Sequence, residues 1–402
     1  MSDLVSLLSA RFFSALGYFS FLFFLALLFL EPPFQFNIAH IATLVGVLAL
    51  TDRGAGILWS SFVNKLGFKK SLQMGLLITF FCSLSVCFFH GYIFCLIALI
   101  GVGSGLSLES LASRLWAASL SSSKEKILCF SSLHRVINAS AVVASLLLFH
   151  IPYQKFILHI LLGIGACFAI SFLIITFCFR SSMQPSMKIP SFLEIVRIIS
   201  KDNAVWCYSL LCLSVFGWGL YVTSQQHLLP FYFKECLRSI PSYMGWIIAL
   251  NPIMIVFLQG GISRLFLYLQ NRMNALGILL GLVFNAVAFS TLSFMNPLYG
   301  VWFFVIFISL GEMLIIPHVD YLLSLRLSSE IRPLIFSLSG IAFSLGRSLS
   351  EGIGIFAIGH LAKSGTGTEW WLANLGVSVF VVMLGGILIV SKLKSPILKV
   401  VS

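Results

Sequence analysis

The chain has 402 residues, of which 59% are hydrophobic and only 9% are charged. Soluble globular domains carry roughly 25% charged residues, so this chain cannot cover a water-facing surface. Its net charge of +12 does not indicate nucleic acid as a partner, because the basic residues lie in short clusters between apolar runs. That distribution is typical of the cytoplasmic loops of membrane proteins.

Twelve apolar runs are long enough to cross a hydrocarbon core of roughly 30 Å. Because lipid offers no hydrogen-bond partner to an open backbone, we expect these runs to be helices. They are too long and too continuously apolar for the alternating strands of a membrane barrel. The expected spans cover residues 12–30, 39–63, 71–89, 93–115, 129–149, 154–178, 206–230, 241–262, 273–294, 299–321, 333–360 and 371–392.

The longest polar stretch follows the sixth span and contains Pro185 and Pro190. It divides the chain into a six-helix bundle at residues 1–180, a central cytoplasmic loop at 181–203 and a second six-helix bundle at 204–402. A six-plus-six layout is typical of internally duplicated transporters. The expected fold class is therefore an all-α integral membrane protein, with twelve transmembrane helices in two six-helix bundles around a central cavity. We expect a monomer in the cell (inner) membrane.

The positions of the basic residues predict the orientation. With the N-terminus inside, eighteen lysines and arginines fall on the inner side and three lie within spans. Only four fall on the outer side: Lys155, Lys234, Arg238 and Lys363. An excess of basic residues marks the cytoplasmic side, so both termini are expected to be cytoplasmic.

Ionisable residues at membrane depth are the candidates for function. Each costs on the order of 2.5–3.5 kcal/mol at the bilayer centre on insertion scales. The second span carries Asp52 and Arg53, and adjacent residues point about 100° apart on a helix. The two cannot share one face, so at least one is expected to have a partner on another helix or to line a wet cavity.

Arg347 and Glu351 are four residues apart in the eleventh span, which stacks them on one helical face. Two interpretations stay open: a mutually neutralising pair that serves insertion, or a proton- or substrate-responsive pair facing the cavity. Arg135 and Asn138, three residues apart, also share a face. The expected substrate and proton pathway comprises Asp52, Arg53, Glu109, Arg135, Asn138, Glu312, Arg347 and Glu351.

The loop between the second and third spans reads Ser60-Ser-Phe-Val-Asn-Lys-Leu-Gly-Phe-Lys-Lys70. It resembles the signature loop of the major facilitator superfamily, G-x-L-x-D-R-x-G-x-R/K-R/K. Ser60 and Asn64 replace the family's first glycine and its aspartate. The resemblance implies a loop at the inner gate that involves Asn64, Lys65, Gly67, Lys69 and Lys70. We expect Gly67 to permit a tight turn, and Lys65 or Lys69 to contact a neighbouring helix end or acidic group.

Three further fragments resemble the twelve-span drug:proton antiporter branch of that superfamily. They are the R-x-x-N of residues 135–138, the G-E-M run of residues 311–313 with Pro317, and the N…Q…R stretch of residues 251–264. The glycine–proline motif that normally follows the first fragment is absent, and Glu351 stands where the branch often has a proline.

The expected function is secondary transport of a small organic solute by alternating access, coupled to protons, with export preferred. One alternative is a proton-coupled importer of a nutrient such as an amino acid, a peptide or an organic anion, since intramembrane arginines suit an anionic substrate. Another is a non-transporting scaffold or receptor, against which the short loops argue. No HExxH, Walker A, GxSxG or zinc-type spacing is present, so we expect no enzyme, no metal and no cofactor.

The predicted orientation can be tested by labelling a single cysteine. In a cysteine-free background, a single cysteine in the 181–203 loop should react with a membrane-impermeant thiol reagent only after the cells are opened. The same cysteine reacting in intact cells would contradict the predicted orientation.

Overall fold

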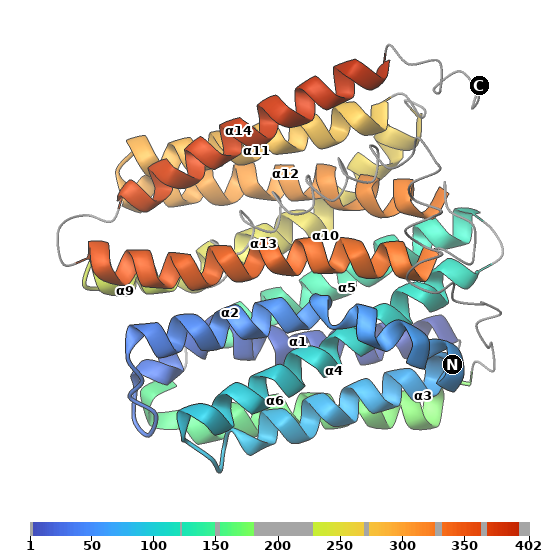
Figure 1. Cartoon of the computed structure of the whole chain (residues 1–402), viewed down its shortest axis with the longest axis horizontal. Coiled ribbons are helices and arrows are strands. Elements are labelled where there is room, and N and C mark those ends of the chain that lie inside the picture. The colour runs from blue at the N-terminus through green and yellow to red at the C-terminus, as the bar shows by residue number, and fades with distance from the viewer. Residues whose placement is uncertain are drawn as a thin grey trace.

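The computed structural model describes residues 3–120, 123–148, 153–180, 228–268, 273–325, 332–362 and 368–393. These ranges contain helices and connecting turns but no strand. The helices run roughly parallel to the long axis of the molecule (Figure 1). They are α1 (Asp3–Leu30), α2 (Ile38–Gly54), α3 (Gly56–Ser85), α4 (Tyr92–Ser119), α5 (Ser123–Leu148), α6 (Tyr153–Cys178), α9 (Leu229–Cys236), α10 (Met244–Tyr268), α11 (Met273–Phe294), α12 (Pro297–Leu325), α13 (Arg332–Leu361) and α14 (Thr368–Leu393).

The helices follow the expected spans with two differences. The span expected at 39–63 is divided between α2 and the first turns of α3, and α1 begins at Asp3, ahead of the expected residue 12. Of the span expected at 206–230, only the last residues, at the start of α9, lie within the described ranges. The 181–203 loop lies outside them. Eight helices in the described ranges are long and apolar enough to cross a membrane.

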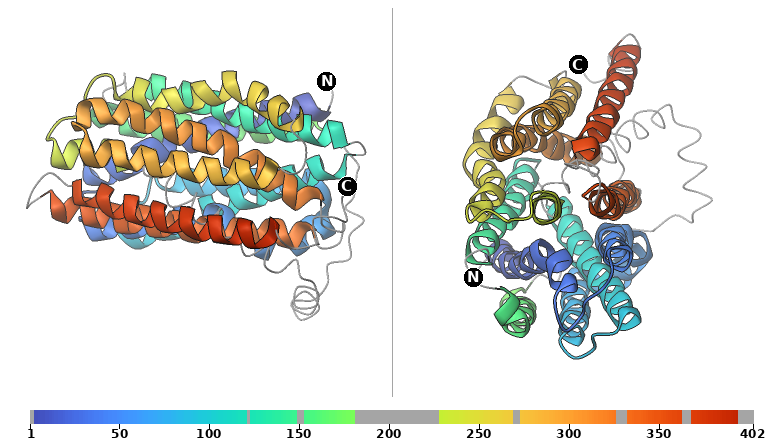
Figure 2. Two further views of the ribbon diagram at one scale, coloured as in Figure 1. Left: turned by 90° about the horizontal axis from the view of Figure 1, so that it is seen from above. Right: turned by 90° about the vertical axis from the view of Figure 1, so that its left-hand side faces the viewer.

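Two groups of helices repeat the same internal contacts. In the first group α3 packs on α4, α2 on α4 and α3 on α6; in the second, α11 packs on α12, α10 on α12 and α11 on α14. The two groups are seen side by side in the end-on view of Figure 2. This is the all-α, two-bundle architecture that the sequence predicts, and its repetition is typical of transporters built from two related halves.

The two bundles meet chiefly along two helix pairs, α2 with α13 and α5 with α10. Helix α1 begins and α14 ends at the same end of the molecule, as expected for an even number of spans (Figures 1 and 2). We call the opposite end the outer end. There Lys234 Nζ of α9 lies 3.2 Å from Glu31 Oε1, just after α1, so an ion pair joins the bundles at the outer end.

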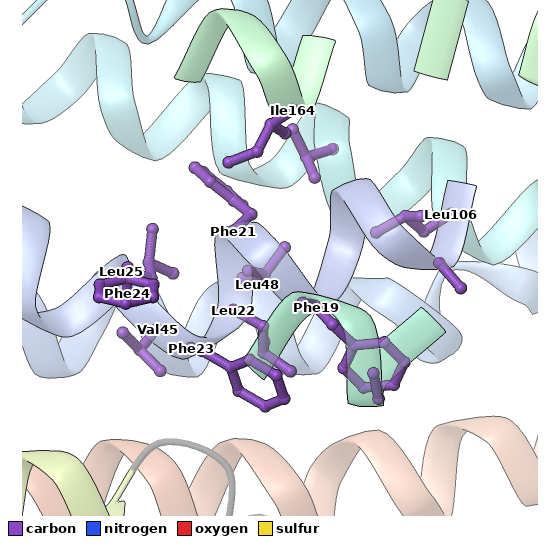
Figure 3. Close-up of a cluster of buried hydrophobic side chains, with 14 of the residues drawn as sticks. Phe19, Phe21, Leu22, Phe23, Phe24, Leu25, Val45, Leu48, Leu106 and Ile164 are labelled. Carbon is purple, nitrogen blue, oxygen red and sulfur yellow. The ribbon is translucent and has the colours of Figure 1, made fainter. Parts of the chain in front are cut away.

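Helix α1 is the interior helix of the first bundle. In its most apolar stretch 78% of residues are buried, and a helix that is hydrophobic all round is expected in an interior. Figure 3 shows Phe21 of α1 near Leu48 of α2 and Ile164 of α6, and all three side chains are buried. This packing fixes the face that α1 turns toward the bundle interface.

Glycines allow the closest helix contacts in both bundles. A methyl group added at Gly75 of α3 would lie 2.7 Å from the carbonyl oxygen of Gly105 in α4. One added at Gly311 of α12 would lie 2.8 Å from the carbonyl oxygen of Gly281 in α11. Small residues at such contacts let helix backbones approach closely in membranes, and the second bundle repeats the contact of the first.

Gly67 interrupts α3 with φ 78° and ψ 170°. This conformation is essentially restricted to glycine, so the turn predicted for Gly67 is confirmed. The break separates the end of the second span from the start of the third and places Lys69 and Lys70 at the beginning of the third.

Replacing Gly67 therefore tests the loop. Gly67→Leu forces a non-glycine residue into this conformation, at a cost of about 1–3 kcal/mol, and should reduce transport in vesicles more than it reduces membrane insertion. The matched control is Gly163→Leu, at a helical position with nothing within 4 Å of an added Cβ. If Gly67→Leu and Gly163→Leu transport equally well, the loop has no role in gating.

Candidate functional site

A buried polar network joins the two bundles at the α2–α13 contact. Arg347 of α13 forms an ion pair with Asp52 of α2, and its Nε donates to Glu351 Oε1 at 2.8 Å. The hydroxyl of Tyr18 in α1 donates to Asp52 Oδ2 at 2.8 Å and accepts a hydrogen bond from Arg347 Nη1. Three helices thus supply the ligands of a single guanidinium. We call Tyr18, Asp52, Arg347 and Glu351 the interface network.

The network is almost completely shielded from solvent. Arg347 is 4% exposed, Asp52 6% and Glu351 0%. In such a setting an unpaired charge is strongly destabilising, whereas a paired and hydrogen-bonded one is tolerated. The i, i+4 pair predicted for Arg347 and Glu351 is present, but within a larger set that also holds Asp52 and Tyr18.

Asp52 and Arg53 point to different partners, as their adjacency on a helix requires. Asp52 pairs with Arg347, while the Arg53 guanidinium lies 4.1 Å from the ring centroid of Phe343. Both partners belong to α13, so the expectation of a partner on another helix is met twice. Two adjacent residues of α2 therefore bind the same helix of the other bundle in two ways.

A second polar group forms where α5, α10 and α12 meet. Asn251 of α10 donates to Glu312 Oε2 of α12 at 3.0 Å, and both side chains are buried. Asn138 of α5 donates to the carbonyl oxygen of His134 at 2.9 Å. Helices α5 and α10 form one of the two main contacts between the bundles, and α10 also packs on α12. This second group therefore also lies close to the contact between the two bundles.

Glu109 lies in a separate cluster inside the first bundle. Its Oε1 lies 2.8 Å from Arg11 Nη1 and accepts a hydrogen bond from Ser14 at 2.7 Å. Both partners belong to α1, so these contacts do not cross the bundle interface. Arg11, which the orientation argument places on the inner side, lies within α1 as the counter-ion of Glu109.

Arg135 is exposed whereas Asn138 is buried, so the two do not share an environment as their spacing suggests. Arg135 forms no ion pair in the described part of the chain. The structure therefore brings Asp52, Arg347 and Glu351 into direct contact and places Arg53 against the same helix α13. It leaves Glu312 in the second group, Glu109 in a separate cluster and Arg135 apart.

The predicted gate loop makes one well-defined contact. Lys69 Nζ donates to the carbonyl oxygen of Thr176 at 3.0 Å, and Gln73 Nε2 donates to the Thr176 hydroxyl at 3.0 Å. Thr176 lies in the last turn of α6, where a cation complements the helix dipole. The helix-end contact expected of Lys65 or Lys69 is made by Lys69; Lys65 and Lys70 are exposed. The side chain of Asn64 lies outside the described residues.

The sequence prediction missed Tyr18, Ser14, Phe343 and the pairing role of Arg11. Tyr18 carries the one available signal, because a phenolic hydroxyl inside an apolar span needs a hydrogen-bond partner. Phe343 is one of many phenylalanines and nothing local distinguishes it. Within the described ranges, no group of three or more His, Cys, Asp or Glu residues is placed to hold a metal.

Two repeated helix bundles that meet at a buried ionic network are the architecture of a secondary transporter. The family described as the Major Facilitator Superfamily matches residues 7–351. The chain belongs to this superfamily and is a multi-pass membrane protein. A search of curated proteins returns no match.

Solved transporters share the fold. The human organic anion transporter MFSD10 (TETRAN) superposes with a TM-score of 0.73 at 10% identity, covering 95% of this chain and 98% of its own. A POT family transporter in complex with 5-aminolevulinic acid gives 0.73 at 11% identity, with 95% and 94% covered. The peptide transporter POT in complex with sulfate gives 0.69 at 14% identity, with 96% and 94% covered. At these identities the likeness establishes the fold alone.

A double-mutant cycle tests the interface network. Arg347→Gln leaves two buried carboxylates without their cation, and Asp52→Asn removes one of them; breaking a buried pair costs about 3–5 kcal/mol. Because the residues interact, the double variant should lose less stability than the sum of the single variants, by about 0.5–3 kcal/mol. Unfolding in mild detergent measures this difference.

The control cycle pairs Asp52→Asn with Glu109→Gln. These carboxylates lie in different clusters, so their effects should add. Additive effects in the Arg347–Asp52 cycle would show that the ion pair has no energetic role.

Proposed function

We propose that this protein is a proton-coupled secondary transporter of a small organic solute, working by alternating access in the direction of export. The observation that carries the proposal is the interface network. It is buried at the contact between the bundles and contains two carboxylates but only one guanidinium. The proposal includes a monomer in the cell membrane with both termini in the cytoplasm.

The charge count makes the network responsive to a proton. With both carboxylates ionised, Tyr18, Asp52, Arg347 and Glu351 carry a net charge of minus one; binding one proton makes the group neutral. A buried net charge is costly, and Arg53, the nearest additional cation in the sequence, is stacked on Phe343. A proton entering the network therefore changes the electrostatic free energy of the bundle interface.

Because Asp52 lies across the bundle interface from Arg347, this change in electrostatic free energy affects the contact between the bundles. Asp52 and Tyr18 belong to the first bundle, whereas Arg347 and Glu351 belong to the second. Protonating Asp52 removes an ion pair across the interface, while Arg347 keeps Glu351 as a partner on its own helix. Proton binding at Asp52 thus weakens the α2–α13 contact without leaving the guanidinium alone, and the bundles can rock apart around it.

Glu312 is the second proton site that we propose. It is buried, it accepts a hydrogen bond from Asn251, and it forms no ion pair among the described residues. Because Glu312 has no salt bridge within these ranges, binding or releasing a proton there breaks no ion pair. The free-energy cost comes from placing the ionised carboxylate away from water.

The proposal also covers the direction of transport and the chemical class of the solute. Export is supported by the resemblance of residues 311–313 to the drug:proton antiporter branch. Import of an organic anion is the second candidate; the exposed Arg135 within α5 favours it, since guanidinium groups recognise carboxylates. Counterflow in proteoliposomes, with labelled cationic, neutral and anionic solutes under an imposed pH gradient, separates the two. The absence of counterflow with every solute class would favour a scaffold or receptor.

Replacing Glu312 tests the coupling. A structural hydrogen bond would be partly retained by Glu312→Gln, leaving pH-driven transport largely intact. A proton carrier instead loses pH-driven accumulation and keeps energy-independent exchange of substrate. We expect at least a tenfold loss of accumulation with exchange within about twofold of the parent, the behaviour of a lost coupling group.

Both modes are measured in the same vesicles, beside Asp52→Asn and the control Glu369→Gln. Glu369 is an exposed carboxylate in the first turn of α14, and its replacement should leave both modes unchanged. If pH-driven accumulation survives in both Glu312→Gln and Asp52→Asn, the assignment of the proton sites is wrong.

A further inference from the structure

A groove of about 590 Å³ follows α3, and all of the residues that line it belong to this helix. It begins beside the Gly67 break and continues along the third span. Six of its lining side chains are apolar: Leu66, Met74, Leu77, Ile78, Phe81 and Cys82. Phe81 is 60% exposed and Leu66 37%, so the groove opens toward the lipid rather than toward another helix of the chain.

A cation stands at one end of this groove. Lys70 lines it, and the opposite end is formed by Phe81 and Cys82. Twelve residues separate Lys70 from Cys82, which corresponds to about 18 Å along a helix. That length suits one extended acyl chain, with its headgroup held beside the ammonium group.

The neighbouring polar groups are already engaged. Lys69 Nζ and Gln73 Nε2 donate to the carbonyl and hydroxyl oxygens of Thr176. Lys70 is exposed and has no ion pair or hydrogen bond within the described ranges. Its charge is therefore available to a ligand in the bilayer, while Lys69 and Gln73 hold the start of the third span against α6.

We propose that this groove binds a phospholipid with an anionic headgroup, with one acyl chain along α3 and the phosphate at Lys70. An acyl chain matches the apolar lining, and juxtamembrane basic residues attract anionic lipids. A second copy of the chain would bring two Lys70 ammonium groups together, which opposes a symmetric contact at this face. The basic loop of residues 65–70 places the site in the cytoplasmic leaflet in the proposed orientation.

Photo-crosslinking tests this site in the full chain. The protein is reconstituted in nanodiscs containing phosphatidylglycerol or phosphatidylcholine with a photoreactive group in one acyl chain, and labelled peptides are identified by mass spectrometry. We expect labelling concentrated between Met74 and Cys82, with a preference of about fivefold for phosphatidylglycerol, the effect of one basic residue near an anionic headgroup.

Two variants and a control make the outcome decisive. Lys70→Gln should abolish the preference for phosphatidylglycerol. Lys65→Gln should keep it, because Lys65 is exposed on the same loop but does not line the groove. Leu77→Trp narrows the groove and should reduce labelling by both lipids. Equal labelling by the two lipids in the parent, labelling spread evenly over all exposed helices, or equal losses in Lys70→Gln and Lys65→Gln would each overturn the proposal.

Discussion

The structure depends on the requirement that a buried guanidinium be neutralised and hydrogen-bonded. Arg347 is 4% exposed, and Glu351 is its only partner among the described side chains of α13. The remaining partners, Asp52 and Tyr18, come from α2 and α1 of the other bundle. Because an isolated buried charge is strongly destabilising, this arrangement holds the two bundles together at the α2–α13 contact.

The interface network and the ion pair at the outer end differ in their exposure to water. Glu31 and Lys234 are both partly exposed, so water compensates each when they part, and such pairs contribute little to stability. Asp52 and Arg347 have no such compensation. A transporter that separates its bundles at α2 and α13 must therefore change the charge of the network or supply a substitute ligand. A proton is the agent that we propose, and a charged solute is another.

Much of the architecture follows from the sequence, because apolar run lengths and basic loops are local signals. The i, i+4 spacing of Arg347 and Glu351 and the turn at Gly67 are equally local, and the structure confirms both. The partners of Asp52 and Glu109 are not local: they lie 295 and 98 residues away in the chain, at Arg347 and Arg11. Tyr18 was missed for the same reason, since its hydroxyl has a role only because Asp52 of α2 and Arg347 of α13 lie beside it. The single break that divides the second span, at Gly54, also lacks a strong local signal.

The most direct test of the central claim measures the α2–α13 distance as a function of pH. Spin labels at Ala39 and His360 occupy exposed positions at the outer ends of these helices, beside the contact of Ile38 with Gly359. We expect a short distance at high pH and a growing population of longer distances as the pH falls. In Asp52→Asn the long-distance population should be present at every pH. A distance distribution that is independent of pH in the parent and unchanged in Asp52→Asn would contradict the claim that the interface network controls the contact between the bundles.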